Sequence, residues 1–261
     1  MVLLAAPAKV TLSLRVTGRR PDGYHLIDAE MVTVDLVDLV DLVDLVDLIE
    51  LDPAEASTVT VVSAEPEDGA VSLDAIALGP DNLVSRALVA AGRTARVTLR
   101  KRIPAGAGLG GGSADAAAVL RWAGVSDPAM AVRLGADVPF CVVGGRALVS
   151  GIGEVVEPLD YVEETLTLLT PPLSCSTAAV YAAWDALGGP SAEGPNDLEP
   201  AALVVEPELV RWRDELAEVA GERPLLAGSG STWFVRGAHP GPGRVVVRTV
   251  PAGWHPSDTD G

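Results

Sequence analysis

The spacing of apolar and polar residues along the chain predicts a mixture of strands and helices. Apolar side chains alternate with polar ones from Leu12 to Val16, which is typical of a half-buried strand, and we extend this strand over residues 2–17. By the same reasoning we expect strands at 59–62, 96–103, 165–169, 232–235 and 245–250, and helices at 82–92, 177–187 and across 198–219.

A run of glycines separates two of these elements near the middle of the chain. The strand at 96–103 leads into the glycine-rich stretch 104–112, and an alanine-rich helix follows and ends near residue 124. A second passage from helix to strand covers 129–149. The sequence therefore predicts an α+β fold, which we divide into two domains, residues 1–155 and 156–261.

Between Val34 and Leu48 the chain repeats Val-Asp-Leu five times. A period of three matches neither the period of two of a strand nor the period of 3.6 of a helix. It is also too short for the repeating unit of a solenoid. We interpret the run as an in-frame expansion that loops out or extends a hairpin, and that adds five negative charges and no chemistry.

Composition narrows the classes of protein to which the chain can belong. Of 261 residues 48% are hydrophobic, and 36 acidic against 19 basic residues give a net charge of −17. This balance argues against a protein that grips nucleic acid through a basic surface, but it permits anionic small molecules held by a few local groups. No stretch reaches the roughly 18 apolar residues of a membrane helix. We expect a soluble cytoplasmic protein with no membrane or nucleic-acid partner.

Residue types that carry chemistry are scarce in this chain. Two cysteines and three histidines, none in zinc-binding spacing, predict no structural metal. Seventeen of the basic residues are arginine, and only Lys9 and Lys101 are lysine. One interpretation is a GC-rich genome that replaced lysine with arginine. The other is that each remaining lysine lies where a compact, rotatable ammonium is required and a planar guanidinium does not fit.

The glycine-rich stretch is the strongest local indication of chemistry. Glycines let backbone N–H groups wrap phosphate oxygens, and the N-terminus of the following helix, which we expect Ser113 to cap, favours anions. No Gly-Lys-Ser/Thr follows, so the stretch is not a Walker loop. Gly106, Gly108 and Gly111 match the dinucleotide-binding pattern Gly-x-Gly-x-x-Gly. The position of the loop in mid-chain, the basic strand before it and the placement of Asp127 in a turn argue against a Rossmann site.

Six short motifs occur in a fixed order along nearly the whole chain. They are Ala6 to Val10, Gly18 to His25, Pro104 to Asp115, Gly135 to Phe140, Asn196 to Pro200 and Ala227 to Ser231. Together they resemble the GHMP kinase superfamily, and within it the branch that acts on 4-diphosphocytidyl-2-C-methyl-D-erythritol. The resemblance implies a two-domain fold with the active site in the cleft between the domains. It also implies ATP-dependent phosphorylation of the 2-hydroxyl of that substrate, a step of the non-mevalonate route to isoprenoid precursors.

The same resemblance implies which residues act on the phosphoryl group. Asp137 is expected to be the base that accepts the hydroxyl proton, and Lys9 the ammonium that keeps this carboxylate ionised and offsets negative charge. We expect Mg²⁺ to accompany ATP; its ligands are not identified, and Ser113 is one candidate. The residues implied for the ATP phosphates are Pro104, Ala105, Gly106, Ala107, Gly108, Leu109, Gly110, Gly111, Gly112, Ser113 and Ala114.

Substrate recognition is implied at four further positions. The cytosine is expected to stack on Tyr24, sandwiched by Tyr181, while His25 hydrogen-bonds the edge of the base. Thr11 occupies the place of an asparagine usual in the family, so the substrate hydrogen bond there is expected to be shorter, lost or water-mediated. The second glycine-rich turn, residues 228–231, is expected to close the back of the site.

Two alternatives stay open at this point. The chain is either another GHMP kinase with a different small alcohol as acceptor, such as homoserine or a mevalonate-like acid, or a nucleotide-binding pseudoenzyme that uses its acidic repeat to bind a partner. Gly23, Tyr24 and His25 favour the cytidine substrate, and the presence of both Lys9 and Asp137 argues against a pseudoenzyme. We expect a small-molecule substrate and a monomer or weak homodimer.

Overall fold

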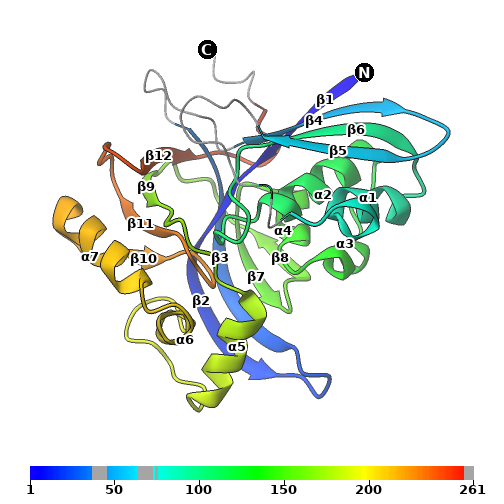
Figure 1. The fold of residues 1–261 in the computed structure, drawn as a ribbon. Coiled ribbons are helices and arrows are strands. Elements are labelled where there is room, and N and C mark those ends of the chain that lie inside the picture. The colour runs from blue at the N-terminus through cyan, green and yellow to red at the C-terminus, as the bar shows by residue number, and fades with distance from the viewer. Residues whose placement is uncertain (37–45, 64–72, 74–75, 256–261) are drawn as a thin grey trace.

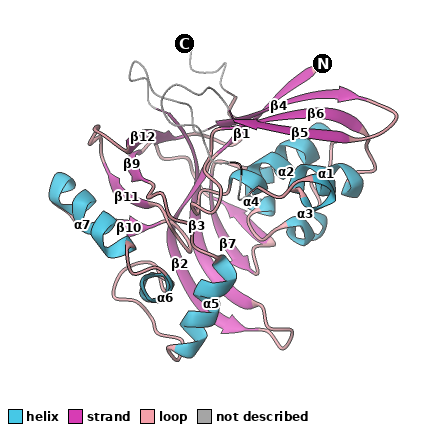
Figure 2. Cartoon of the chain, in the orientation of Figure 1, coloured by secondary structure: helices cyan, strands magenta, loops and turns pink. Residues whose placement is uncertain are grey.

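Two β-sheets, each with its own set of helices, account for most of the chain. The computed structural model describes residues 1–36, 46–63, 73 and 76–255. Figure 1 shows α1 to α4 beneath the smaller sheet and α5 to α7 beside the larger one. This mixture of helices and strands (Figure 2) confirms the predicted α+β class. In the described part of the chain, no helix is both long and apolar enough to cross a bilayer.

The smaller sheet carries the strand that leads into the glycine-rich loop. Its strand order is β1-β4-β6-β5, with β5 and β6 parallel and the other pairs antiparallel. The bounds are Val2–Pro7 for β1, Val46–Pro53 for β4, Thr58–Ser63 for β5 and Ala95–Lys101 for β6. Alternate side chains of β6 are buried, and Lys101 lies on this inward face with Val97 and Leu99. A lysine thus occupies a position where the strand period predicts an apolar residue.

The larger sheet has the order β10-β11-β9-β12-β3-β7-β8, and β2 also pairs with β3. The bounds are Lys9–Arg19 for β2, His25–Leu36 for β3, Arg146–Gly151 for β7, Val155–Pro158 for β8, Thr165–Leu169 for β9, Leu225–Leu226 for β10, Trp233–Arg236 for β11 and Arg244–Thr249 for β12. Because β12 pairs with β3, the sheet contains strands from both sides of residue 155. The division into domains 1–155 and 156–261 stays a prediction.

Helices cover the sheets and carry several of the candidate site residues. The bounds are Leu83–Ala90 for α1, Gly111–Trp122 for α2, Pro128–Leu134 for α3, Val138–Val143 for α4, Thr177–Ala186 for α5, Glu199–Val205 for α6 and Leu209–Ala220 for α7. The predicted strand at 165–169 and the predicted helix at 177–187 correspond to β9 and α5. The strand predicted over 2–17 is two strands, because β1 ends at Pro7 and pairs in the smaller sheet while β2 pairs in the larger one.

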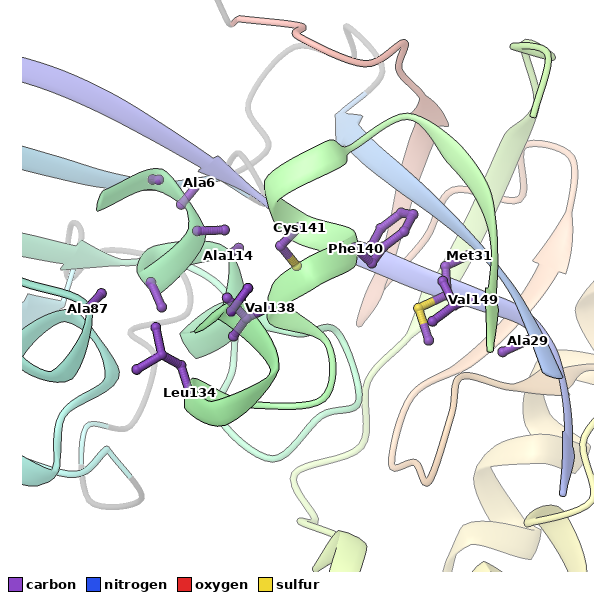
Figure 3. Close-up of a cluster of buried hydrophobic side chains, with 14 of the residues drawn as sticks. Ala6, Ala29, Met31, Ala87, Ala114, Leu134, Val138, Phe140, Cys141 and Val149 are labelled. Carbon is purple, nitrogen blue, oxygen red and sulfur yellow. The ribbon is translucent and has the colours of Figure 1, made fainter. Parts of the chain in front are cut away.

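The apolar core extends from the helices beneath the smaller sheet to strands β3 and β7. Figure 3 shows the part to which α4 contributes Val138, Phe140 and Cys141, near Met31 and Val149. Phe140 is fully buried, so α4 cannot shift without opening a cavity. This packing fixes the position of the residue that precedes α4, which is Asp137.

The Val-Asp-Leu run enters the folded structure at both ends. Its first copy ends β3 and its last copy begins β4, and these strands lie in different sheets. Residues 37–45, the three middle copies, lie outside the described residues. Asp35 and Asp47 are buried, with 7% and 0% of their surface exposed. The interpretation of the run as a loop or hairpin extension without chemistry is therefore wrong for Asp47, which has a buried cationic partner described below.

Candidate active site

Two residues that stand between the glycines hold the glycine-rich loop between β6 and α2 in place. Ala107 and Leu109 are 2% and 1% exposed and belong to the apolar cluster of the larger sheet. The N–H of Lys9 donates to the carbonyl of Leu109 over 3.0 Å, and the N–H of Thr232 donates to the carbonyl of Ala107 over 3.1 Å. The anchored loop lines a cavity of about 320 Å³. The alternation of glycines with small apolar residues thus lets the loop be fixed to the core and still line a cavity.

Most residues implied for the ATP phosphates lie around this cavity. Pro104 to Ser113 line it, whereas Ala114 does not and is buried within α2. Helix α2 begins at Gly111, with Gly110 as its N-cap in the left-handed conformation at φ 71°. Ser113 is therefore a residue of the first turn, and the prediction that it caps the helix is wrong. Because no side chain caps α2, the first-turn N–H groups are left to an anion.

We expect Gly108→Ala to raise the KM for ATP at least about tenfold, because the added Cβ displaces the glycine-rich loop that binds the phosphates. A Cβ at Gly108 would lie 2.5 Å from the carbonyl oxygen of Ala227 and 2.9 Å from that of Gly230, at a φ of +79°. Gly124→Ala is the matched control, since Gly124 has a similar φ of +73° but nothing within 4 Å. Steady-state kinetics of both variants separate collision in the loop from backbone strain alone. Equal KM values in the two variants would contradict this role of Gly108.

The fold brings the side chains of Lys9 and Asp137 into contact, although the two residues are 128 positions apart in the sequence. Lys9 begins β2, and Asp137 directly precedes α4, whose first turn contains Pro139. The ammonium of Lys9 lies 3.2 Å from Oδ2 of Asp137 and donates a 3.1 Å hydrogen bond to the hydroxyl of Thr11. The Lys9 side chain is 5% exposed, whereas that of Asp137 is 32% exposed. A fixed cation thus holds a carboxylate that solvent or a ligand can reach.

Asp137 lies where two cavities meet. The larger, of about 790 Å³, is lined by Lys9, Thr11, Asp137 and the second glycine-rich turn, and it extends to residues of α5. The smaller is the glycine-loop cavity described above. Asp137, Gly108, Ser113 and Thr177 line both of them. The site therefore has two compartments that share one carboxylate, and residues before and after position 155 contribute to it.

The second glycine-rich turn lies behind the lysine. A Cβ on Gly228 would be 3.7 Å from Nζ of Lys9, and the hydroxyls of Ser229 and Thr177 are 3.0 Å apart. The side-chain amide of Asn196 donates to the carbonyls of Leu226 and Gly228 and so fixes the turn. The turn therefore forms one wall of the larger cavity, at the place where the sequence predicts closure.

An aromatic cluster forms the far end of the larger cavity. The His25 imidazole stacks on the Tyr181 ring with centroids 4.7 Å apart and 22° between the planes, and it meets the Trp184 ring edge-on. Burial raises the pKa of the Tyr181 phenol. Tyr24 is 60% exposed, with the Arg20 guanidinium 6.0 Å from its ring centroid. The structure brings Tyr24, His25 and Tyr181 to one cavity, and it stacks Tyr181 on His25.

A second lysine lies beneath the glycine loop, between two buried carboxylates. The Lys101 ammonium donates to Asp115 over 2.8 Å and to Asp47, and Asp47 also accepts from the backbone N–H groups of Arg102 and Ile103. Asp47 thereby ties β4 to the first residues of the loop, while Asp115 ties Lys101 to α2. Burial lowers the pKa of Lys101, but Asp115 and Asp47 outweigh it and hold that pKa above its usual value.

The Asp115 carboxyl makes the stability of the protein depend on pH. Burial, opposed by the charge of Lys101 and reinforced by that of Asp47, raises the Asp115 pKa to about 8. The folded state then binds this proton more tightly than the unfolded state, so its contribution to stability is lost as pH rises toward 8. When the pH is raised from about 6 to about 9, the unfolding free energy of wild type should fall. We expect that of Asp115→Asn to fall by about 2–3 kcal/mol less. Denaturant unfolding at both pH values checks this, and parallel pH dependences would contradict it.

No cluster that could hold a metal ion through three or more histidine, cysteine or acidic side chains occurs within the described residues. The oxygens of Ser113 and Asp137 lie where both cavities meet.

Sequence reasoning missed Asp47, Asp115 and Asp185. Only the rarity of lysine pointed toward the first two, through Lys101, and nothing local pointed to Asp185, whose partner His25 is 160 positions away.

Comparison with known proteins places this arrangement in a class. The family model for the N-terminal domain of GHMP kinases matches residues 82–145, which include the glycine loop and Asp137. A homoserine kinase from Cytophaga hutchinsonii, 17% identical, shares the fold with a TM-score of 0.55 over 96% of this chain and 95% of its own. The fold is therefore that of the GHMP kinases.

More similar relatives define the family within that class. The 4-diphosphocytidyl-2-C-methyl-D-erythritol kinase of Cereibacter sphaeroides is 36% identical over 257 residues, covering 88% of this chain and 87% of the relative. A crystal structure of 4-(cytidine 5'-diphospho)-2C-methyl-D-erythritol kinase, 34% identical, matches with a TM-score of 0.67 over 92% of this chain and 91% of its own. The chain belongs to the 4-diphosphocytidyl-2-C-methyl-D-erythritol kinase family.

Proposed function

We propose that the protein transfers the γ-phosphoryl group of ATP to the 2-hydroxyl of 4-diphosphocytidyl-2-C-methyl-D-erythritol, in the non-mevalonate route to isoprenoid precursors. One observation carries the proposal: the Lys9–Asp137 pair lies at the junction of a glycine-loop cavity and a larger cavity with an aromatic end. Phosphoryl transfer needs a phosphate cradle and an acceptor pocket that meet at a base. The family membership of the chain supplies the identity of the two substrates.

On the nucleotide side, the triphosphate lies against the glycine loop. Backbone N–H groups of the loop and the uncapped N-terminus of α2 stabilise the phosphate oxygens, and the glycines let them approach closely. Magnesium bound to the phosphates would add charge neutralisation. The Ser113 hydroxyl, which lines both cavities, would be its protein ligand.

On the acceptor side, Asp137 takes the proton of the 2-hydroxyl as that oxygen bonds to phosphorus. The Lys9 ammonium, fixed by Asp137 and Thr11, orients the carboxylate and offsets the negative charge of the moving phosphoryl group. Thr11 accepts from Lys9 and lines the larger cavity, so its own O–H can donate to the substrate. The cytosine lies at the aromatic end, against Tyr24 and beside His25 and Tyr181.

A coupled ADP-release assay with Mg-ATP and three acceptors tests the proposal. Turnover with the cytidylyl substrate and none with homoserine or mevalonate is the expected result. Turnover with homoserine or mevalonate alone would keep the phosphotransfer chemistry and overturn the acceptor assignment. Absence of turnover with all three would favour a nucleotide-binding protein without activity.

A further inference from the structure

Asp185 of α5 holds both ends of the turn that connects β2 to β3. Its Oδ1 lies 2.8 Å from Nε2 of His25, and its Oδ2 lies 3.2 Å from a guanidinium nitrogen of Arg19. Those two residues face each other as the closing pair of the β2–β3 hairpin. Each carboxylate oxygen therefore has its own partner, and the orientation of the carboxylate is fixed.

This contact decides which imidazole nitrogen of His25 carries the hydrogen. The hydrogen bond from His25 lowers the pKa of Asp185, so the carboxylate is ionised at neutral pH and can only accept. The shared hydrogen must then lie on Nε2, and in a neutral imidazole Nδ1 keeps its lone pair. None of the described residues hydrogen-bonds Nδ1, and His25 lines the larger cavity.

The imidazole is also prevented from turning. Tyr181 stacks on the face of the ring and Trp184 meets it edge-on, and both belong to α5 with Asp185. Only 10% of the His25 side chain is exposed. One helix thus fixes the position, the orientation and the tautomer of a histidine that lines the ligand cavity.

We propose that Asp185 is a positioning residue that makes the enzyme specific for cytosine over uracil. This inference rests on the proposed function and adds the residue that sets base specificity. A lone pair on Nδ1 accepts the hydrogen of the 4-amino group of cytosine, and it repels the 4-oxo oxygen of uracil. The expected discrimination is about ten- to a hundredfold, as for one directed hydrogen bond.

Asp185→Asn tests the proposal because the amide is isosteric and neutral. Arg19 attracts the amide oxygen, which leaves the NH₂ group facing Nε2 of His25 and forces the hydrogen onto Nδ1. In serine proteases the corresponding change from aspartate to asparagine in the catalytic triad holds the histidine in the wrong tautomer, so a switch of this kind has a precedent. We expect binding of CDP to weaken and binding of UDP to strengthen, each about tenfold or more.

The readouts are imidazole ¹⁵N spectra at alkaline pH and calorimetric binding of CDP and UDP. The chain has three histidines, so the His25 signals are assigned by comparison with His25→Gln. The control is Asp214→Asn, since Asp214 also lies on a helix and pairs with an arginine, Arg213, but lines neither cavity. This control should leave the spectrum and the CDP preference unchanged.

Each outcome is decisive. An Nε2–H signature in wild type that changes to Nδ1–H in Asp185→Asn, with a reduced preference for CDP, supports the proposal. An unchanged tautomer or an unchanged ratio of CDP to UDP affinity overturns it. Neither readout needs turnover, so a failure of the proposed kinase activity is seen separately, in the ADP-release assay.

Discussion

Asp137→Asn should reduce kcat with the cytidylyl substrate by about 10²–10⁴-fold, the usual contribution of a general base. The amide keeps the shape of the carboxylate and can still accept a hydrogen bond from Lys9, which lies 3.2 Å away, but it cannot take the proton of the hydroxyl. Because the glycine loop is unchanged, ATP affinity should remain within a few-fold of wild type. Single-turnover kinetics and calorimetric ATP titration measure the two quantities.

A matched substitution separates the chemistry of Asp137 from the general effect of changing aspartate to asparagine at the start of a helix. Asp127 is the N-cap of α3, where its side chain accepts from the N–H of Ala129, and it lines neither cavity. Asp127→Asn should leave kcat within about twofold, since asparagine is also a good N-cap. A rate in Asp137→Asn near that of wild type would remove Asp137 as the base.

Lys101→Met should lower the free energy of unfolding by about 3–5 kcal/mol, the usual cost of removing one partner of a buried ion pair. Asp47, at 0% exposure, would be left without its cation, and Asp115, at 2% exposure and with its pKa raised to about 8, would lose the hydrogen bond from Lys101. Asp47 and Asp115 also fix the start of the glycine loop and of α2 through Lys101, so the KM for ATP should rise. Urea unfolding and ATP kinetics test both effects.

The neighbouring residue on β6 provides the control. Arg100 pairs with Glu50 over 2.9 Å, but both side chains are partly exposed, at 44% and 32%. Exposed pairs of this kind contribute about 0–1 kcal/mol, so Arg100→Met should have a small effect. Equal losses of stability in Lys101→Met and Arg100→Met would contradict the structural role of the buried lysine.

Local sequence features predicted the elements and motifs that depend on short stretches of chain. The glycine loop, β9 and α5 follow from residue periods and from glycine itself, and the α+β class follows from their alternation. The rarity of lysine proved informative, because Lys9 and Lys101 are 4% and 2% exposed and both face carboxylates. A Cβ on Gly110 would come within 2.7 Å of the Lys9 side chain, which leaves little room there for a guanidinium.

Features that depend on contacts between distant segments could not be predicted. The Val-Asp-Leu period gave no hint that Asp47 is buried, because its partner Lys101 lies on another strand. The residue pattern placed the cap of α2 at Ser113, whereas the loop ends one turn earlier in the left-handed conformation of Gly110. Asp185 has an ordinary helical context, and its hydrogen bond with His25 exists only once α5 packs beside the β2–β3 hairpin.

The most direct test of the central claim is the ³¹P spectrum of the product made from ATP and 4-diphosphocytidyl-2-C-methyl-D-erythritol. The 2-carbon carries the methyl group and no hydrogen, so a phosphate on its oxygen gives a phosphomonoester signal without three-bond coupling to a proton. We predict this singlet, and we predict its loss in Asp137→Asn. A doublet or a triplet would place the phosphate on a secondary or a primary hydroxyl and would contradict the account.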